Sequence, residues 1–188
     1  MHPHSDSPRA RRALIAAALL AVPLALGACG PDPSRGRPTA TPAPTSTALY
    51  ASDEEALAAA EEVYREYLDV VYRVLVEEAP LQELESVTSG EVLDLEISTA
   101  TRFRESGGRT EGRSQLRYMD LVETSISKNR AVIVTLACED ISNVHVFDSS
   151  GTSLVPESRS DFALSEVTLE TVNGLLLITS LTLQGTEC

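Results

Sequence analysis

Hydrophobic residues recur every three or four positions between Leu57 and Leu75, a spacing typical of one face of an α-helix. The pattern predicts a helix from Ser52 to about Glu78. Ser52 followed by Glu55 is a capping-box sequence, which marks the start. The expected buried stripe consists of Leu57, Ala60, Tyr64, Leu68, Val71 and Leu75, widened by Tyr67 and Val74.

Two further helices are expected before the pattern changes. Pro80 stops the first helix and suits the first position of a short second one, Leu81 to Val87. A third helix is expected from Ser89 to Arg104, and Gly107-Gly108 ends it. Its predicted buried residues are Val92, Leu95, Ala100 and Phe103.

From about Thr110 the chain is rich in β-branched residues and turn sequences, which predicts strands. The expected strands are Gln115 to Ser127, Arg130 to Cys138, Val144 to Phe147, Thr152 to Val155, Asp161 to Val172 and Leu175 to Leu183. The nearly continuous apolar run before Cys138 indicates a central strand. Asp148-Ser149-Ser150-Gly151 and Asn173-Gly174 each predict a hairpin, the second by the strongest short signal known. Helices followed by an antiparallel meander predict an α+β domain with helices on one face of the sheet.

The first residues form an export signal. Met1 to Arg12 carries three arginines, and Ala13 to Leu26 is apolar apart from Pro23. Those fourteen residues would make only ~21 Å of helix, too short for a hydrocarbon core of ~30 Å. Leu26-Gly27-Ala28-Cys29 resembles the bacterial lipobox, which implies cleavage before Cys29 and a diacylglyceryl group on its sulphur. The alternatives are an ordinary secretory signal and, from Arg11-Arg12, twin-arginine rather than general export.

The expected organisation is a signal peptide over residues 1–28, a lipidated cysteine with a Pro/Thr-rich tether over 29–51, and a folded domain over 52–188. Prolines keep the tether extended, so about twenty residues at ~3 Å each let the domain stand up to ~60 Å from its anchor. The predicted location is the extracytoplasmic face of the cell membrane.

Charge limits the partners. Residues 1–28 hold three of the 15 basic and one of the 28 acidic residues, so the processed chain would carry 12 basic and 27 acidic ones. This acidity excludes nucleic acid and flat contact with anionic lipid, since both need a basic surface. The membrane is then reached through the lipid on Cys29.

Lipidation of Cys29 leaves two cysteines, Cys138 and Cys188. Outside the reducing cytosol a pair of thiols predicts a disulfide. It would close a 51-residue loop, which stabilises by about 4 kcal/mol on chain-entropy grounds. The alternative is Cys138 as a nucleophile with His145 as its base.

Candidate chemistry is sparse, and no catalytic residue, cofactor or metal site is predicted. His145 is expected at the surface, and Asp120, amid apolar residues, is the candidate for a neutral carboxyl group in a cavity. Four tyrosines could offer hydroxyl groups: Tyr64, Tyr67, Tyr72 and Tyr118. A small acidic cluster consists of Glu139, Asp140, Asn143 and Asp148. Its spacing is not that of a calcium loop, so Asx-type turns are expected here and not a calcium site. The sequence has no G-x-S-x-G, H-E-x-x-H or Cys-x-x-Cys.

Cys138-x-Asp140-x-Ser142, then Asp148-x-x-Gly151, a two-strand ending and Cys188 resemble actinobacterial lipoproteins with a nuclear-transport-factor-like (SnoaL-like) domain. The resemblance covers about residues 52–188 and implies a cone-like fold, in which a curved sheet wraps a long first helix. It also implies that a homodimer through the sheet face is an option. The chain departs from the pattern at Leu175-Leu176-Leu177, where such proteins often carry Trp.

Two functions are compatible with these features. The first is a non-catalytic binding or interaction module for an extracytoplasmic protein or a small apolar ligand. The alternative is a SnoaL-like isomerase or cyclase acting on an apolar small molecule. A pocket that contains Asp120, or a tyrosine together with a carboxyl group of raised pKa, would favour the enzyme. A pocket filled by Leu and Val side chains would exclude the enzyme.

Overall fold

A computed structural model describes residues 48–188. The predicted signal peptide, Cys29 and the tether up to residue 47 lie outside the described residues, so their assignments stay predictions. No helix within residues 48–188 is both long enough and apolar enough to cross a membrane.

The first helix, α1 (Asp53–Leu75), begins where the capping sequence predicts. The Glu55 amide donates to the Ser52 hydroxyl at 3.3 Å, and the Glu55 carboxylate accepts from the Ala51 amide at 2.6 Å. The helix ends at Leu75, three residues before the predicted end. Glu77 there adopts a positive φ of 62°, which turns the chain out of the helix.

The buried face of α1 differs from the predicted stripe. The side chains that are buried belong to Ala56, Ala60, Tyr64, Tyr67, Val70 and Val74. Leu57, Leu68, Val71 and Leu75, which the spacing placed at the centre, are only half-buried at its margin. Ala56 and Ala60 are fully buried, so the contact face of α1 runs along these small side chains and not along the leucines.

A 3₁₀ helix, η1 (Leu81–Ser86), and α2 (Gly90–Glu105) follow, as predicted in position. The prediction that Leu95 is buried is wrong, because 60% of its surface is exposed. The buried residues of α2 are Val92 and Ala100, and the half-buried Glu96 lies between them on the same face, four residues from each. Phe103 is half-buried.

The main sheet contains β2 (Gln115–Ile126), β3 (Ala131–Asp140), β5 (Phe162–Val172) and β6 (Leu175–Gly185), in the order β2-β3-β5-β6, all antiparallel. β3 is central, as predicted. Asn173 and Gly174 both have positive φ, 52° and 86°, as the predicted tight hairpin requires. Irregular register in the β2–β3 and β5–β6 pairs accompanies the curvature of the sheet.

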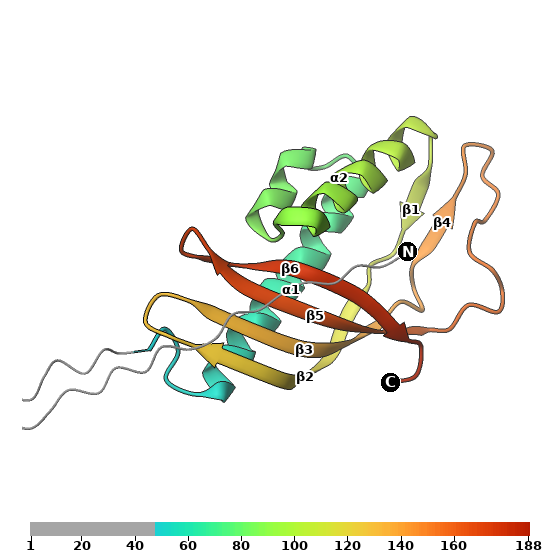
Figure 1. Ribbon diagram of the computed structural model, residues 1–188. Helices are drawn as coiled ribbons and strands as arrows, with labels where there is room; N and C mark the ends of the chain where they lie inside the picture. Colours follow the sequence, from blue (N-terminus) through green and yellow to red (C-terminus); the bar gives the residue numbers. More distant parts are fainter. Residues whose placement is uncertain (1–47) are drawn as a thin grey trace, which may run out of the picture. The chain divides into compact units, whose positions relative to one another are not determined.

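The helices lie against one face of this curved sheet, with α1 crossing it and α2 near the β6 edge (Figure 1). The core forms between α1 side chains such as Tyr64 and Val70 and sheet residues such as Ile133, Leu169 and Ile178. The structure therefore confirms the α+β, cone-like fold with N-terminal helices on a curved antiparallel sheet.

The predicted hairpin around Asp148–Gly151 forms only in part: the Leu154 amide donates to the Val146 carbonyl oxygen at 2.8 Å, but the predicted returning strand from Thr152 to Val155 is not formed. β4 (His145–Phe147) pairs with β1 (Arg109–Glu111) in a separate two-stranded sheet, and only a single bridge joins Phe147 to Ser153. The turn itself forms, but the Val155 amide then donates to the Ser153 hydroxyl at 3.2 Å. Such local side-chain bonds compete with a strand ladder, so the returning segment does not form a strand.

Candidate functional site

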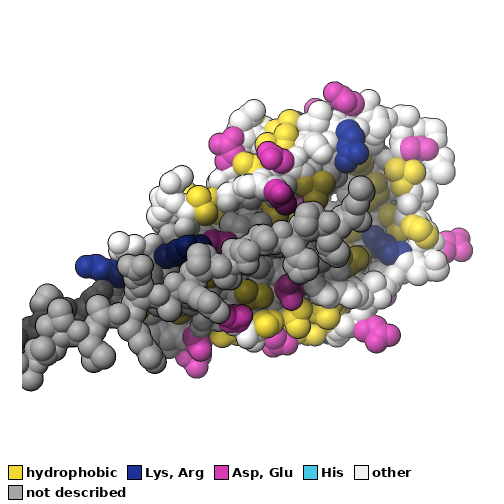
Figure 2. All heavy atoms as spheres, in the orientation of Figure 1, with side chains coloured by type: hydrophobic (Ala, Val, Ile, Leu, Met, Phe, Trp, Pro, Cys, Tyr) yellow, Lys and Arg dark blue, Asp and Glu magenta, His cyan; other side chains and the backbone are white. Residues whose placement is uncertain are grey.

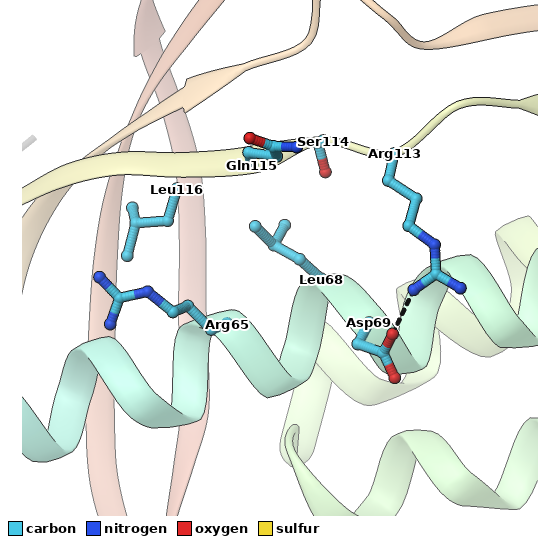
Figure 3. Close-up of a pocket in the computed structure, with 7 residues that line it drawn as sticks. All are labelled: Arg65, Leu68, Asp69, Arg113, Ser114, Gln115 and Leu116. Atoms are coloured by element: carbon cyan, nitrogen blue, oxygen red, sulfur yellow. Dashed lines mark hydrogen bonds and ion pairs between the residues drawn. The ribbon is translucent and has the colours of Figure 1, made fainter.

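Two adjoining hollows lie beside α1 at the end of the sheet where β2 begins. The inner pocket, about 160 Å³, is bounded by α1, the β1–β2 connection, β3 and β6, and contains Tyr67, Val71, Ser114, Glu139 and Leu181. The outer pocket, about 310 Å³, is lined by Arg65, Leu68, Asp69, Arg113, Ser114, Gln115 and Leu116 (Figure 3). The two share Leu68, Arg113 and Ser114, so they lie next to each other.

Glu139 is the acidic group of the inner pocket. In β3 every second residue from Ala131 faces α1, and this alternation carries Ile133, Ala137 and finally Glu139 to the helix. The Tyr64 hydroxyl donates to the Glu139 carboxylate. Burial raises the pKa of Glu139 above its usual value, although hydrogen bonds from Tyr64 and Ser114 act in the opposite direction. The site thus contains a carboxyl group biased towards its neutral form.

A second tyrosine–carboxyl pair lies beside the first. The Tyr67 hydroxyl donates to Glu96 of α2 at 2.7 Å, and the rings of Tyr64 and Tyr67 are 5.6 Å apart between centroids. Burial, reinforced by the facing carboxylates, raises the pKa of both tyrosines far above the usual range. Both hydroxyl groups therefore stay protonated and act as donors at any physiological pH.

Arg113 is held in place at the boundary of the two pockets. Its guanidinium lies 3.9 Å from the centroid of the Tyr72 ring and forms an ion pair with Asp69 (Figure 3). Asp69 also accepts from Arg73 at 2.7 Å, and these arginines, Arg73 first, lower the pKa of Asp69. An ionised Asp69 fixes the orientation of Arg113.

The backbone before Arg113 requires glycine. Gly112 has a φ of 75°, and a Cβ atom at this position would collide with the carbonyl oxygen of Asn143. The close approach of these two segments brings Arg113 and Ser114 over α1.

Asp120 does not contribute to either pocket, so its predicted role is wrong. Its neighbour Met119 is the buried residue of that stretch of β2, whereas Asp120 is exposed on the other face of the sheet. Tyr118 is also exposed, at 39%. His145 is exposed on β4, as expected.

The acidic cluster is not gathered into one site. Glu139 faces α1, whereas Asp140 and Asp148 accept hydrogen bonds from Ser142 and Ser150 in Asx-type turns. These bonds lower the pKa of Asp140 and Asp148. Within residues 48–188 no group of three or more His, Cys, Asp or Glu side chains is placed to hold a metal ion.

Cys138 and Cys188 are joined, with sulphur atoms 2.08 Å apart and Cα atoms 6.0 Å apart. The bond links central strand β3 to the end of the chain beyond β6. A disulfide-bonded Cys138 has no thiolate, which removes the alternative of a Cys138–His145 nucleophile.

Sequence reasoning missed the residues that define the site: Glu96, Arg113, Ser114 and the inward role of Glu139. A signal was present for two of them. Glu96 lies midway between Val92 and Ala100 at helical spacing, and Glu139 continues the alternation of Ile133, Thr135 and Ala137. Nothing local distinguishes Arg113 and Ser114, because the fold alone brings their loop to α1.

Comparison with known proteins reveals similarity of fold only. No protein-family model matches the chain, and no curated protein matches it. The intermembrane space region of the chloroplast protein ARC6 matches with a TM-score of 0.50 and 13% identity, over 68% of this chain and 95% of that one. Aln2 from a Streptomyces species gives a TM-score of 0.40 and 16% identity, over 71% and 92%. At these identities the chain is similar to ARC6 in its α+β architecture, and no function is transferred.

Proposed function

We propose that this protein is a lipid-anchored extracytoplasmic lipoprotein with a nuclear-transport-factor-like domain, and that this domain binds a small, mainly apolar molecule in the inner pocket. The observation that carries the proposal is the composition of that pocket. Apolar side chains of α1, of β6 and of Val144 directly before β4 form most of its wall. A few polar groups come from the β1–β2 connection and from β3. Such a wall is typical of small-molecule sites, in which few polar groups orient an apolar ligand.

Binding without reaction is favoured by the way the acidic and phenolic groups are already paired. The Tyr67 hydroxyl at the pocket wall donates to Glu96, and the Tyr64 hydroxyl donates to Glu139, the acid of the pocket. An acid–base catalyst needs a group free to exchange a proton with the substrate. The pairs therefore support a structured wall more readily than a reacting one.

The anchor part of the proposal rests on the lipobox-like sequence ending at Cys29 and on the proline-rich segment after it. A short tether and an acidic domain would keep the pocket in solution beside the membrane. The ligand would then arrive from the extracytoplasmic side.

One experiment tests the pocket directly. The neutral apolar dye N-phenyl-1-naphthylamine is titrated into the full-length protein and its fluorescence is followed. Val71 lines the inner pocket, so Val71→Phe should fill it and weaken dye binding at least tenfold. Val122 is 54% exposed on β2, so Val122→Phe is the matched control and should bind as the wild type does. Equal binding by the two variants would contradict the proposal.

A second candidate function is favoured by one observation, the raised pKa of Glu139 at the pocket wall. A carboxyl group of this kind can serve as general acid or base in an isomerase or cyclase. Mass spectrometry and NMR of a bound ligand recovered from the protein separate the two functions. Recovery of an isomer with the wild type, but of unchanged ligand with Glu139→Gln, would establish the enzyme.

A further inference from the structure

The outer pocket concentrates positive charge on an acidic domain. Of the chain's 15 Lys and Arg residues, five precede residue 48, and two of the remaining ten, Arg65 and Arg113, line this one hollow. Of the 28 acidic residues, 26 follow residue 48, yet only Asp69 lines it. Acidic side chains dominate the charged atoms visible on the domain surface in Figure 2. The hollow is therefore a local exception to a strongly negative surface.

Arg113 is oriented before any ligand arrives. Asp69 binds one terminal nitrogen of its guanidinium, and the Tyr72 ring supports its plane. Among residues 48–188, Asp69 is the sole hydrogen-bond acceptor of this group, so its other N–H donors remain available (Figure 3). A fixed guanidinium with free donors matches the geometry of an oxyanion, because the planar fork can donate two parallel bonds.

Neutral donors and a second cation lie close to Arg113. Ser114 and Gln115 project from the start of β2 above Leu68, and Arg65 lies on the other side of Leu68 along α1 (Figure 3). Arg65 is paired with Glu61 at 2.9 Å and is half-exposed, so its contribution is weaker than that of Arg113.

The charged and apolar parts of the site adjoin each other. Arg113, Ser114 and Leu68 belong to both pockets, and the apolar side chains of the inner pocket include Val71, Leu75 and Leu181.

We infer that the site takes an amphipathic anion, with a carboxylate or phosphate head group in the outer pocket at Arg113 and an apolar chain in the inner pocket. This inference rests on the proposed function and specifies its ligand class. Arg113 is the specificity-determining residue, since it selects the charged head group and leaves the apolar contact unchanged.

The test compares four probes on the full-length protein by isothermal titration. Dodecanoate and dodecyl phosphate are used below their critical micelle concentrations, the neutral dodecanol below its solubility limit, and acetate as a head group without a chain. At least one dodecyl anion should bind about tenfold more tightly than dodecanol, since a hydrogen bond to a charged group contributes roughly that factor. The stronger of the two anions identifies the head group. Acetate should bind far more weakly than either, because it lacks the apolar chain.

Variants of Arg113 provide the second arm. Arg113→Gln should remove the preference for the anions, so that they bind no more tightly than dodecanol does, and urea unfolding checks that the variant folds. Arg113→Lys keeps the charge but not the planar fork, so an intermediate preference is expected. Arg130→Gln is the matched control, because Arg130 is an exposed, ion-paired arginine outside both pockets.

The outcomes distinguish a failure of the inferred ligand class from a failure of the proposed binding function. Equal affinity for dodecanol and both anions, or an Arg113→Gln protein that keeps the preference, would overturn the inference and leave the apolar pocket intact. If the wild-type protein bound neither the amphiphiles nor the dye, the proposed function would be overturned as well.

Discussion

At the scale of single residues, Glu139 is the most unusual group in the domain. It lies at the end of a strand whose inward positions are otherwise small or apolar, and its hydrogen-bond donor is a fully buried tyrosine. Burial of a carboxyl group penalises its charged form. Hydrogen bonds from Tyr64 and Ser114 partly offset that penalty.

The pH dependence of stability follows from this environment. The folded-state pKa of Glu139 lies above its usual value of 4.5. The contribution of Glu139 to the free energy of unfolding is therefore fully present below the unfolded-state pKa and is lost as the pH rises through the folded-state pKa. Glu139→Gln cannot ionise. Urea unfolding from pH 4 to pH 8 should show wild-type stability falling relative to Glu139→Gln, by at most about 1.4 kcal/mol per pH unit.

Two further variants test whether the pH dependence comes from Glu139. Tyr64→Phe removes a donor that favours the charged carboxylate, so the pKa of Glu139 should rise further and the loss should steepen. Glu123 is exposed on β2, and Glu123→Gln is expected to follow the wild-type curve. A Glu139→Gln curve parallel to that of the wild type would contradict the assignment.

At the scale of elements, the position of the β1–β2 connection decides where the site forms. β1 pairs with β4, and Gly112 lets the chain pass directly against Asn143 before β2 begins. That passage carries Arg113 and Ser114 over α1. The site is therefore a product of one tight contact between two loops.

Separate substitution of two glycines distinguishes the effect of backbone strain from that of a steric clash between an added Cβ atom and a neighbouring backbone. Gly112 and Gly174 both have positive φ, 75° and 86°, but only Gly112 has a backbone atom where a Cβ would lie. Gly174→Ala should lower the free energy of unfolding by about 1 kcal/mol through strain alone. Gly112→Ala should lower it by more and should also weaken dye binding, as urea unfolding and titration would reveal. Equal losses of stability, with dye binding intact, would exclude the close contact.

At the scale of the whole molecule, one covalent bond connects the centre of the sheet with the end of the chain. The Cys138–Cys188 bond spans a sequence separation of 50 residues and encloses β4, β5 and β6. The enclosed hairpin would otherwise depend on strand pairing and on contacts with the helices.

Removal of this bond should cost about 4 kcal/mol, the loop-closure entropy restored to the unfolded chain. Cys138→Ala with Cys188→Ala tests the value by urea unfolding, and wild-type protein under reducing conditions should give a matching curve. A double variant as stable as the oxidised wild type would show that the bond contributes nothing to folding.

The proposed anchor is tested in a bacterium that processes lipoproteins. Cys29→Ala should move the protein from the membrane fraction to the soluble extracytoplasmic fraction, because the tether would then carry no lipid. The Cys138→Ala/Cys188→Ala variant serves as control and should stay with the membrane. A wild-type protein that is soluble under these conditions would refute lipidation.

Much of the architecture was determined by local sequence. The capping pair Ser52 and Glu55, the apolar run of β3 and the Asn173-Gly174 turn each act over a few neighbouring residues, so they predicted the elements in which they lie. The exceptions arise where local spacing alone does not decide burial. Leu154 and Leu95 match strand and helix spacing, yet both are more than half exposed because no partner surface reaches them.

The site was decided only by tertiary structure. Asp120 looked buried from its apolar neighbours, but the pleat of β2 turns it outward, while the same alternation in β3 turns Glu139 inward against Tyr64. Arg113 and Asp69 are 44 positions apart, and nothing in either neighbourhood predicts their pairing. Sequence by itself determined the helices, most of the strands and the pairing of the two remaining cysteines, because those depend on local spacing and on counting. Only packing between distant segments decided which polar groups would be enclosed together.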